Sequence, residues 1–267
     1  MIWAIVGALL AIPLGAFVLR PRVRTWFGGD FQGLKIESFV GPIVTLTVFL
    51  AAFVMAQATQ SFQRANQDAS AEGSAVSLLF ENAAMLPDGA GKDLQATSVC
   101  YARAVHHIEW PAMTDGETAP EVDHWDAQFN TLVPKVLSGP GSLVGQVVSL
   151  NRSQSEARTL RLYEASPHLP VLTVALMIIS IIGVLLLLMS FAHHDMKRKV
   201  LLGFGIVLAL LLGGTLFLVE QLEEPFRGVV KVQPSVIAKV ERDTGALFAA
   251  QYPGATLPCD TVGRPVA

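Results

Sequence analysis

The chain has 267 residues, of which 52% are hydrophobic and only 15% are charged, and its formal net charge at pH 7 is −3. Soluble domains carry about 25% charged residues, so this composition argues against an ordinary soluble protein. Four windows contain no Asp, Glu, Lys, Arg or His, and each is about as long as a bilayer-spanning helix. These windows are residues 2–19, 39–56, 171–191 and 200–219.

The first window is followed by a basic cluster made of Arg20, Arg22 and Arg24. A cleaved signal peptide has its basic residues before the apolar stretch rather than after it. We therefore expect a retained membrane helix with its N-terminus outside the cytoplasm. None of the windows contains an ionisable residue that could relay protons, which argues against a proton-coupled carrier or pump.

The loops after the first and third windows are short and basic. Residues 20–38 carry four Lys and Arg residues, and residues 192–199 carry three. Lys and Arg next to membrane helices stay on the cytoplasmic side. We therefore expect both loops in the cytoplasm, and the segment 57–170 and the tail 220–267 outside it.

A continuous helix is expected to start in the second window and to run beyond it, because no proline interrupts the chain after Ile43 until Pro87. In a ring of subunits, one face of this helix could line a pore, with two phenylalanines as an apolar constriction that gates ions and a cationic mouth that favours anions. The alternative is that the phenylalanines pack against the third and fourth membrane helices. The residues of this face follow steps of three and four, and they are Leu46, Phe49, Phe53, Gln57, Gln60 and Arg64.

The segment between the second and third windows shows helical periodicity. Pro111 is expected to end its first helix, and Pro134 to bend its second. No alternating strand pattern is present, so we expect a helical extramembrane domain. The expected helices cover residues 93–110, 121–137 and 143–163.

The two cysteines, Cys100 and Cys259, are expected on the same side of the membrane. In an oxidising compartment they could form a disulfide. The alternative for Cys100 is a small buried core residue, because it lies in a helical pattern. The distance between the two Cα atoms decides between these interpretations, and the sequence does not give it.

The fourth window is followed at once by a turn, in the sequence EQLEEPFRGV. Pro225 prevents the helix from continuing, and Gly228 allows a sharp reversal. Phe226 is then expected to pack back against the helical domain, so we interpret this corner as a structural docking point for the tail. The acidic partners considered for Arg227 are Glu81 and Glu164.

Motifs for phosphate binding, acyl transfer, zinc proteases and redox chemistry are missing from the sequence. We therefore expect no enzymatic activity and no cofactor. Adjacent helical residues point about 100° apart, so two neighbouring histidines are not expected to face one ion. A solvated helix face is the preferred interpretation, and no metal is expected. The residues weighed as metal ligands are His106, His107, Glu109, Asp123, His124 and Asp126.

Four stretches of the chain resemble the bacterial family of bestrophin-like membrane proteins. Together they span most of residues 40–235, and the PFxG element is the most specific of them. They read AQATQSFQRANQDASAEGSAVSLLFENAAMLP, CYARAVHHIEWPAM, NRSQSEARTLRLYEASPHLPVL and LEEPFRGVVKVQP.

The resemblance implies kinship to bestrophins, which are pentameric anion channels with four membrane helices and a large helical domain. In bestrophins the second helix lines the pore with aromatic and aliphatic rings, which by position would correspond to Phe49 and Phe53. Bestrophins keep the helical domain in the cytoplasm, whereas the charges here place it outside. Their acidic calcium-binding residues do not map onto this sequence.

These observations predict an all-α membrane protein with four transmembrane helices and a helical extramembrane domain inserted between helices two and three. Residues 1–56 would hold two membrane helices and a basic loop, and residues 57–170 the domain. Residues 171–219 would hold the other two membrane helices, and residues 220–267 an extramembrane tail.

We expect a multi-pass protein of a bacterial inner membrane that forms a homo-oligomer in the lipid bilayer. The leading hypothesis is a channel-like pore for small ions, lined by the second helix. The alternative is a non-conducting membrane protein whose helical domain binds a partner or senses the cell envelope. Nucleic acid is not expected as a partner.

Overall fold

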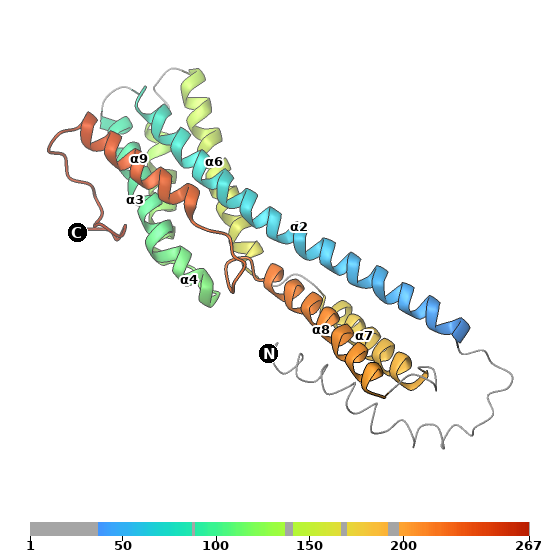
Figure 1. Ribbon diagram of the computed structural model, residues 1–267. Coiled ribbons are helices and arrows are strands. Elements are labelled where there is room, and N and C mark those ends of the chain that lie inside the picture. Colours follow the sequence, from blue (N-terminus) through green and yellow to red (C-terminus); the bar gives the residue numbers. More distant parts are fainter. Residues whose placement is uncertain (1–36, 87–88, 137–140, 167–169, 192–197, 267) are drawn as a thin grey trace. The chain divides into compact units, whose positions relative to one another are not determined.

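The structure is a computed structural model of the chain, and it describes residues 37–86, 89–136, 141–166, 170–191 and 198–266 (Figure 1). The described residues form helices and no strand, which confirms the expected all-α class. In chain order the elements are α2 (Glu37–Ala83), α3 (Gly89–Ala104), the π-helical turn η1 (Val105–Glu109), α4 (Trp110–Asp115), α5 (Pro120–Leu132), the 3₁₀ turn η2 (Val133–Val136), α6 (Gly141–Glu164), α7 (Val171–Phe191), α8 (Arg198–Glu223) and α9 (Ser235–Gln251).

Two described helices are long and apolar enough to cross a membrane, namely Gly41–Ala83 within α2 and Leu202–Glu223 within α8. A shorter apolar run, Leu172–Leu188, lies within α7. The expected span at residues 2–19 lies outside the described residues, as does most of the basic loop 20–38. Four membrane spans therefore remain a prediction.

The long continuous helix expected from the proline-free stretch after Ile43 is α2, but it begins earlier, at Glu37, with Pro42 inside it, and it ends at Ala83. It contributes to both of the compact units into which the chain divides. The first, which we call the apolar-helix unit, comprises Met1–Gln60 and His168–Glu223. The second, which we call the helical domain, comprises Ser61–Pro167 and Glu224–Ala267.

The apolar-helix unit has a core of small and aliphatic side chains. Helices α7 and α8 lie side by side (Figure 1), and α2 joins their core through Val54 and Ala58, which are buried one turn apart. The other buried members of this core are Met177, Ile181, Leu185, Ala209 and Val219. This spacing gives α2 one inward face, and it leaves the opposite face outside this core.

The helical domain is built around α3, which contacts both α5 and α9. Tyr101 of α3 is fully buried, with its ring centroid 5.7 Å from that of Phe129 in α5. Helix α9 in the tail is an element that the sequence analysis did not predict. Its buried residues follow helical steps and were readable in the sequence: Ile237, Val240, Thr244 and Phe248.

The expectation that Pro111 ends the helix begun in α3 is wrong. The chain continues through η1 into α4, where Pro111 lies in the first turn, and the helix ends only at Gly116, whose φ is +79°. A proline inside a helix has no N–H to donate and clashes with the preceding turn. The wider π-helical turn just before it avoids part of this conflict, because the Trp110 N–H donates to the Val105 carbonyl five residues back. Next to Pro134, α5 gives way to η2, which begins at Val133; the bend expected at Pro134 stays a prediction.

The end of the tail is fastened to α3 by a disulfide between Cys100 and Cys259, whose Cα atoms lie 5.7 Å apart. The structure therefore joins the pair that the sequence left open. Next to it, the Trp125 indole N–H donates to the Gly263 carbonyl at 2.7 Å. Gly263 has a φ of +93° and lies against the backbone of Ala104, where an added Cβ would come within 2.3 Å of the Ala104 nitrogen.

We predict that Gly263→Ala lowers the free energy of unfolding of the helical domain by at least about 3 kcal/mol, because it combines a strained backbone with a direct clash. Gly254 provides a matched control: its φ is +80°, yet a Cβ there would meet nothing within 4 Å. Gly254→Ala should therefore cost only about 1–2 kcal/mol. Chemical unfolding of the detergent-solubilised chain, followed by tryptophan fluorescence, measures both values. Equal losses in the two variants would contradict the close packing at Gly263.

Candidate functional site

The proposed pore face of α2 is exposed in the structure. Leu46, Phe49 and Phe53 keep 68%, 71% and 58% of their surface accessible, while Val54 and Ala58, which lie on a different face of the helix, are buried. The two phenylalanines therefore do not pack into the described core of α7 and α8, which was the alternative interpretation of this stripe. Large apolar side chains left uncovered on one helix face are suited to contact lipid, another subunit or a pore.

The polar end of this face differs from the expected cationic mouth. Gln60 is exposed and Gln57 partly so, but Arg64 is paired, with its Nε 3.1 Å from the Oε1 atom of Glu164. The hydroxyl of Ser61 donates to the other oxygen of the same carboxylate at 2.6 Å. Arg64 is therefore one half of an ion pair rather than an isolated cation.

A further acid, Asp68, lies one turn beyond Arg64 on α2. Burial and the neighbouring Glu164 carboxylate raise the pKa of Asp68, and Arg64 opposes this shift. The charges gathered here are thus one guanidinium and two carboxyl groups. Arg64 alone gives no basis for selecting anions.

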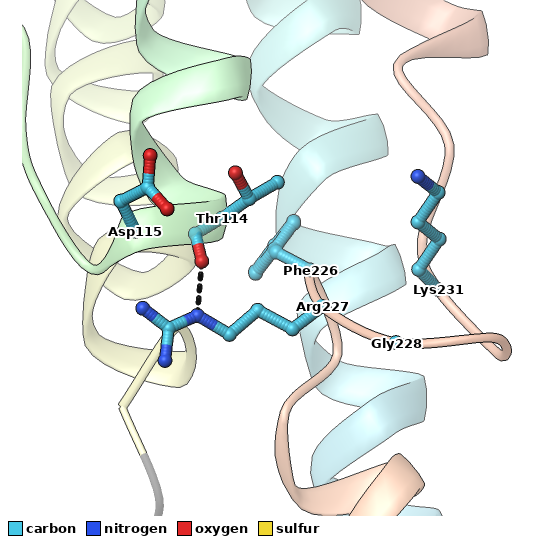
Figure 2. A pocket seen from close by; sticks show the side chains of 6 residues that line it. All are labelled: Thr114, Asp115, Phe226, Arg227, Gly228 and Lys231. Atoms are coloured by element: carbon cyan, nitrogen blue, oxygen red, sulfur yellow. Dashed lines mark hydrogen bonds between the residues drawn. The ribbon is translucent and has the colours of Figure 1, made fainter.

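The PFxG corner after α8 forms the wall of an open pocket of roughly 540 Å³ (Figure 2). Phe226 is buried, and its ring meets that of Trp110 edge-on, with 5.5 Å between centroids. Gly228 has a φ of +79°, which permits the reversal, and the Val232 N–H donates to the Pro225 carbonyl at 2.7 Å to close it. The structure thus confirms that Phe226 packs against the helical domain.

Arg227 does not reach Glu81 or Glu164, the acids considered from the sequence. Figure 2 shows its Nε donating to the backbone carbonyl of Thr114 at the end of α4. A cation at a helix C-terminus satisfies a carbonyl that has no partner inside the helix, and it interacts favourably with the helix dipole. The corner therefore caps α4 with a charged side chain from the tail. The pocket is lined by Thr114, Asp115, Phe226, Arg227, Gly228 and Lys231.

A cluster of charged side chains lies inside the helical domain. Arg161 of α6 is fully buried and contacts two carboxylates, Glu72 of α2 through its Nε and Glu109 of η1 through a terminal nitrogen. Arg158, one turn earlier, donates to Glu109 Oε1 at 2.6 Å and to Asp123 Oδ1 at 2.7 Å. We call Glu72, Glu109, Arg158 and Arg161 the buried network; its formal charges cancel.

Aromatic residues complete the buried network. The Tyr101 hydroxyl donates to Glu72 Oε1 at 2.5 Å, and the Trp110 ring lies 5.4 Å from the centre of the Arg161 guanidinium. Burial together with the Glu72 and Glu109 carboxylates raises the pKa of Tyr101 well above its ordinary value, so its hydroxyl stays a hydrogen-bond donor.

The arginines keep Glu109 ionised although it is buried. Burial raises the pKa of Glu109, but the guanidinium groups of Arg161 and Arg158 outweigh this effect and hold the pKa below its ordinary value. Burial lowers the pKa of each arginine, and the carboxylates that it contacts more than reverse this. A network with all its members charged is consistent with these opposing effects.

The structure disperses the six residues that the sequence analysis weighed as metal ligands. Glu109 and Asp123 belong to the environment of Arg158, and the His124 ring lies 4.9 Å from that of Trp125. His106 and His107 instead lie together at a carboxylate of α9. The sequence analysis did not name Glu72, Arg158 or Arg161; the available signal was two arginines three residues apart on an expected helix.

A model of the bestrophin-like domain matches residues 8–237, which is most of the chain. The chain belongs to the bestrophin-like family. The resemblance seen in its sequence stretches is thereby confirmed. The match ends at residue 237, so most of α9 and Cys259 lie beyond it.

Solved structures with the same fold include crystal structures of a bacterial bestrophin homologue from Klebsiella pneumoniae. One is 12% identical to this chain, with a TM-score of 0.71, and the alignment covers 95% of this chain and 100% of the homologue. A substituted variant of that homologue is 11% identical, covers 90% and 98%, and has a TM-score of 0.72. At such identities the likeness establishes the fold alone. A comparison with curated proteins gave no match.

We predict that Glu109→Gln destabilises the helical domain by about 3–5 kcal/mol at neutral pH, because it leaves two buried arginines short of a carboxylate. The wild-type pKa of Glu109 is lower in the folded chain than in the unfolded chain. Its stabilising contribution is therefore present above the unfolded pKa and is lost as the pH falls through the folded pKa. Unfolding curves recorded from neutral to acidic pH should show a shallower loss of stability in the variant.

The matched control for this measurement is Glu117→Gln, which changes an exposed glutamate between α4 and α5. It should leave the unfolding free energy and its pH dependence close to those of the wild type. An unchanged stability of Glu109→Gln, or an equal effect of the two substitutions, would contradict the role assigned to the buried network.

Proposed function

We propose that this chain forms an oligomeric membrane channel for small ions, with α2 lining the pore. The observation that carries the proposal is the position of Phe49 and Phe53. Both are exposed on α2, outside the core that Val54 and Ala58 form with α7 and α8. Membership of the bestrophin-like family supports it, because the resemblance implies anion channels whose second helix lies at the axis.

In a ring of subunits, the exposed face of α2 would present phenylalanine rings to a common axis. Phe49 and Phe53 are one helical turn apart, about 6 Å along the axis, so they would form two stacked apolar rings. Such a constriction stops ions by losing its water and conducts when it widens. The paired Arg64 offers no selectivity of its own, so we propose small ions without naming the preferred charge.

The membrane placement that this function requires is supported by the remaining exposed surface of the apolar-helix unit. Leu172 and Ile179 of α7 and Leu211 of α8 are more than half exposed in the single chain. Apolar surface on this scale is not stable in water and is matched by lipid or by other subunits. A bacterial inner membrane and four spans are part of the proposal.

We predict that Phe53→Ala increases the ion conductance of the purified full-length chain in planar bilayers several-fold, because it removes one apolar ring from the constriction. Phe204→Ala is the matched control, since Phe204 lies on α8 and is exposed to a similar degree, 55% against 58%. The control should conduct like the wild type. An absence of current from the wild type and from Phe53→Ala would overturn the channel and favour a partner-binding or envelope-sensing protein.

We further propose that the helical domain faces an oxidising compartment outside the cytoplasm. The disulfide between Cys100 and Cys259 supports this orientation, because stable disulfides form in the periplasm or outside the cell rather than in the cytosol. The basic loops at 20–38 and 192–199 support it independently, since they would then lie on the cytoplasmic side.

We predict that a single cysteine placed at Leu247, which is exposed on α9, reacts with a membrane-impermeant thiol reagent in spheroplasts. Both native cysteines are in the disulfide, so the added thiol is the reactive one. Lys199→Cys, at the start of α8, is the control for the other side and should react only after lysis. The reverse pattern of labelling would place the helical domain in the cytoplasm.

A further inference from the structure

The two neighbouring histidines of η1 converge on one carboxylate of α9. His106 Nδ1 lies 2.6 Å from Glu241 Oε2, and His107 Nε2 lies 3.0 Å from Glu241 Oε1. The two imidazole rings are 4.3 Å apart between centroids, with planes 42° apart. The expectation that adjacent histidines on a helix face different directions is therefore wrong at this point of the chain.

The π-helical turn explains how adjacent residues reach one point. A π-helix has more residues per turn than an α-helix, so successive side chains diverge by less than about 100°. The rings also present different atoms: His106 uses the nitrogen nearer the backbone, and His107 the nitrogen at the far end of its ring. The two choices compensate for the remaining angle between the side chains.

We propose that His106, His107 and Glu241 bind one transition-metal ion of the zinc type. Their three ligand atoms all lie within 4.8 Å of one another. Zinc binds imidazole nitrogen and carboxylate oxygen at about 2.0–2.2 Å, which places ligand atoms of a tetrahedral site a little over 3 Å apart. The two nitrogen–oxygen separations, 2.6 and 3.0 Å, are shorter than this, and the widest separation is at most 4.8 Å, so the side chains would rearrange by up to about 1 Å around the ion.

The chemistry of the three ligands selects the class of metal. Two imidazoles with one carboxylate suit zinc, copper or nickel, whereas calcium and magnesium prefer oxygen ligands. Each imidazole would bind through the nitrogen that now faces Glu241, with its proton on the other ring nitrogen. Three protein ligands leave a fourth position for water, and the histidines are partly exposed, so an ion can enter from solvent.

A metal at this position would link η1 to α9 independently of the disulfide, which links α3 to the segment after α9. Arg103, one turn before His106, donates to the Asp260 carbonyl at 3.1 Å and is engaged with that segment. The two links would therefore hold the same two parts of the helical domain together. This inference does not depend on ion conduction.

The test is calorimetric titration of Zn²⁺ into the full-length chain in detergent, purified through a tag without histidine. We expect one saturable site per chain and a higher melting temperature with zinc present. Glu241→Gln and His107→Ala should each weaken zinc binding at least tenfold. His124→Ala, which removes an exposed histidine outside the cluster, should leave the affinity unchanged.

A second probe separates a built site from loose surface binding. Co²⁺ bound by two nitrogens and an oxygen in tetrahedral geometry gives intense visible absorption, and Zn²⁺ added in equal amount should abolish it. Excess Ca²⁺ or Mg²⁺ should not. Circular dichroism of the metal-free variants shows whether they are folded. A lack of saturable zinc binding by the wild type, or equal binding by wild type and both cluster variants, would overturn the proposal.

Discussion

The helical domain depends on the neutralisation of charge in its interior. Arg161 has no exposed surface, and it lies between carboxylates supplied by α2 and by η1, while Arg158 holds the second of these carboxylates from the other side. A single one of these charges without its partners would cost several kcal/mol in such a place. The helices that supply them must therefore pack in one register, because any other register leaves a charge unpaired.

The apolar-helix unit follows a different rule, because the core of its described residues is built from apolar side chains. Small and aliphatic side chains, such as Val54 and Ala58, let its helices approach closely. The faces that this leaves uncovered are also apolar. The two units thus suit two environments. The helical domain pairs its buried charges, whereas the apolar-helix unit has both an apolar interior and an apolar surface.

The helices of the chain were predictable because their signals are local: apolar windows of bilayer length, and apolar residues at helical spacing. The buried network was not predictable, since Glu72 and Arg161 are far apart in sequence and nothing local marks them as partners. The disulfide was left open for the same reason. Two other features do have local signals. Proline is tolerated in the first turn of a helix, so Pro111 does not have to end one, and the buried residues of α9 follow helical spacing in the sequence.

The π-helical turn before Pro111 acts as a one-residue insertion in an otherwise α-helical segment. It sets the direction of Glu109, its last residue, toward the arginines, and of two groups after it in the same helix, Trp110 toward Phe226 and the Thr114 carbonyl toward Arg227. Deletion of one residue from this turn would restore regular winding and rotate those groups by about 100° relative to α3. The deletion of one residue would therefore break both the ion pairs of the domain interior and the contacts that hold its tail.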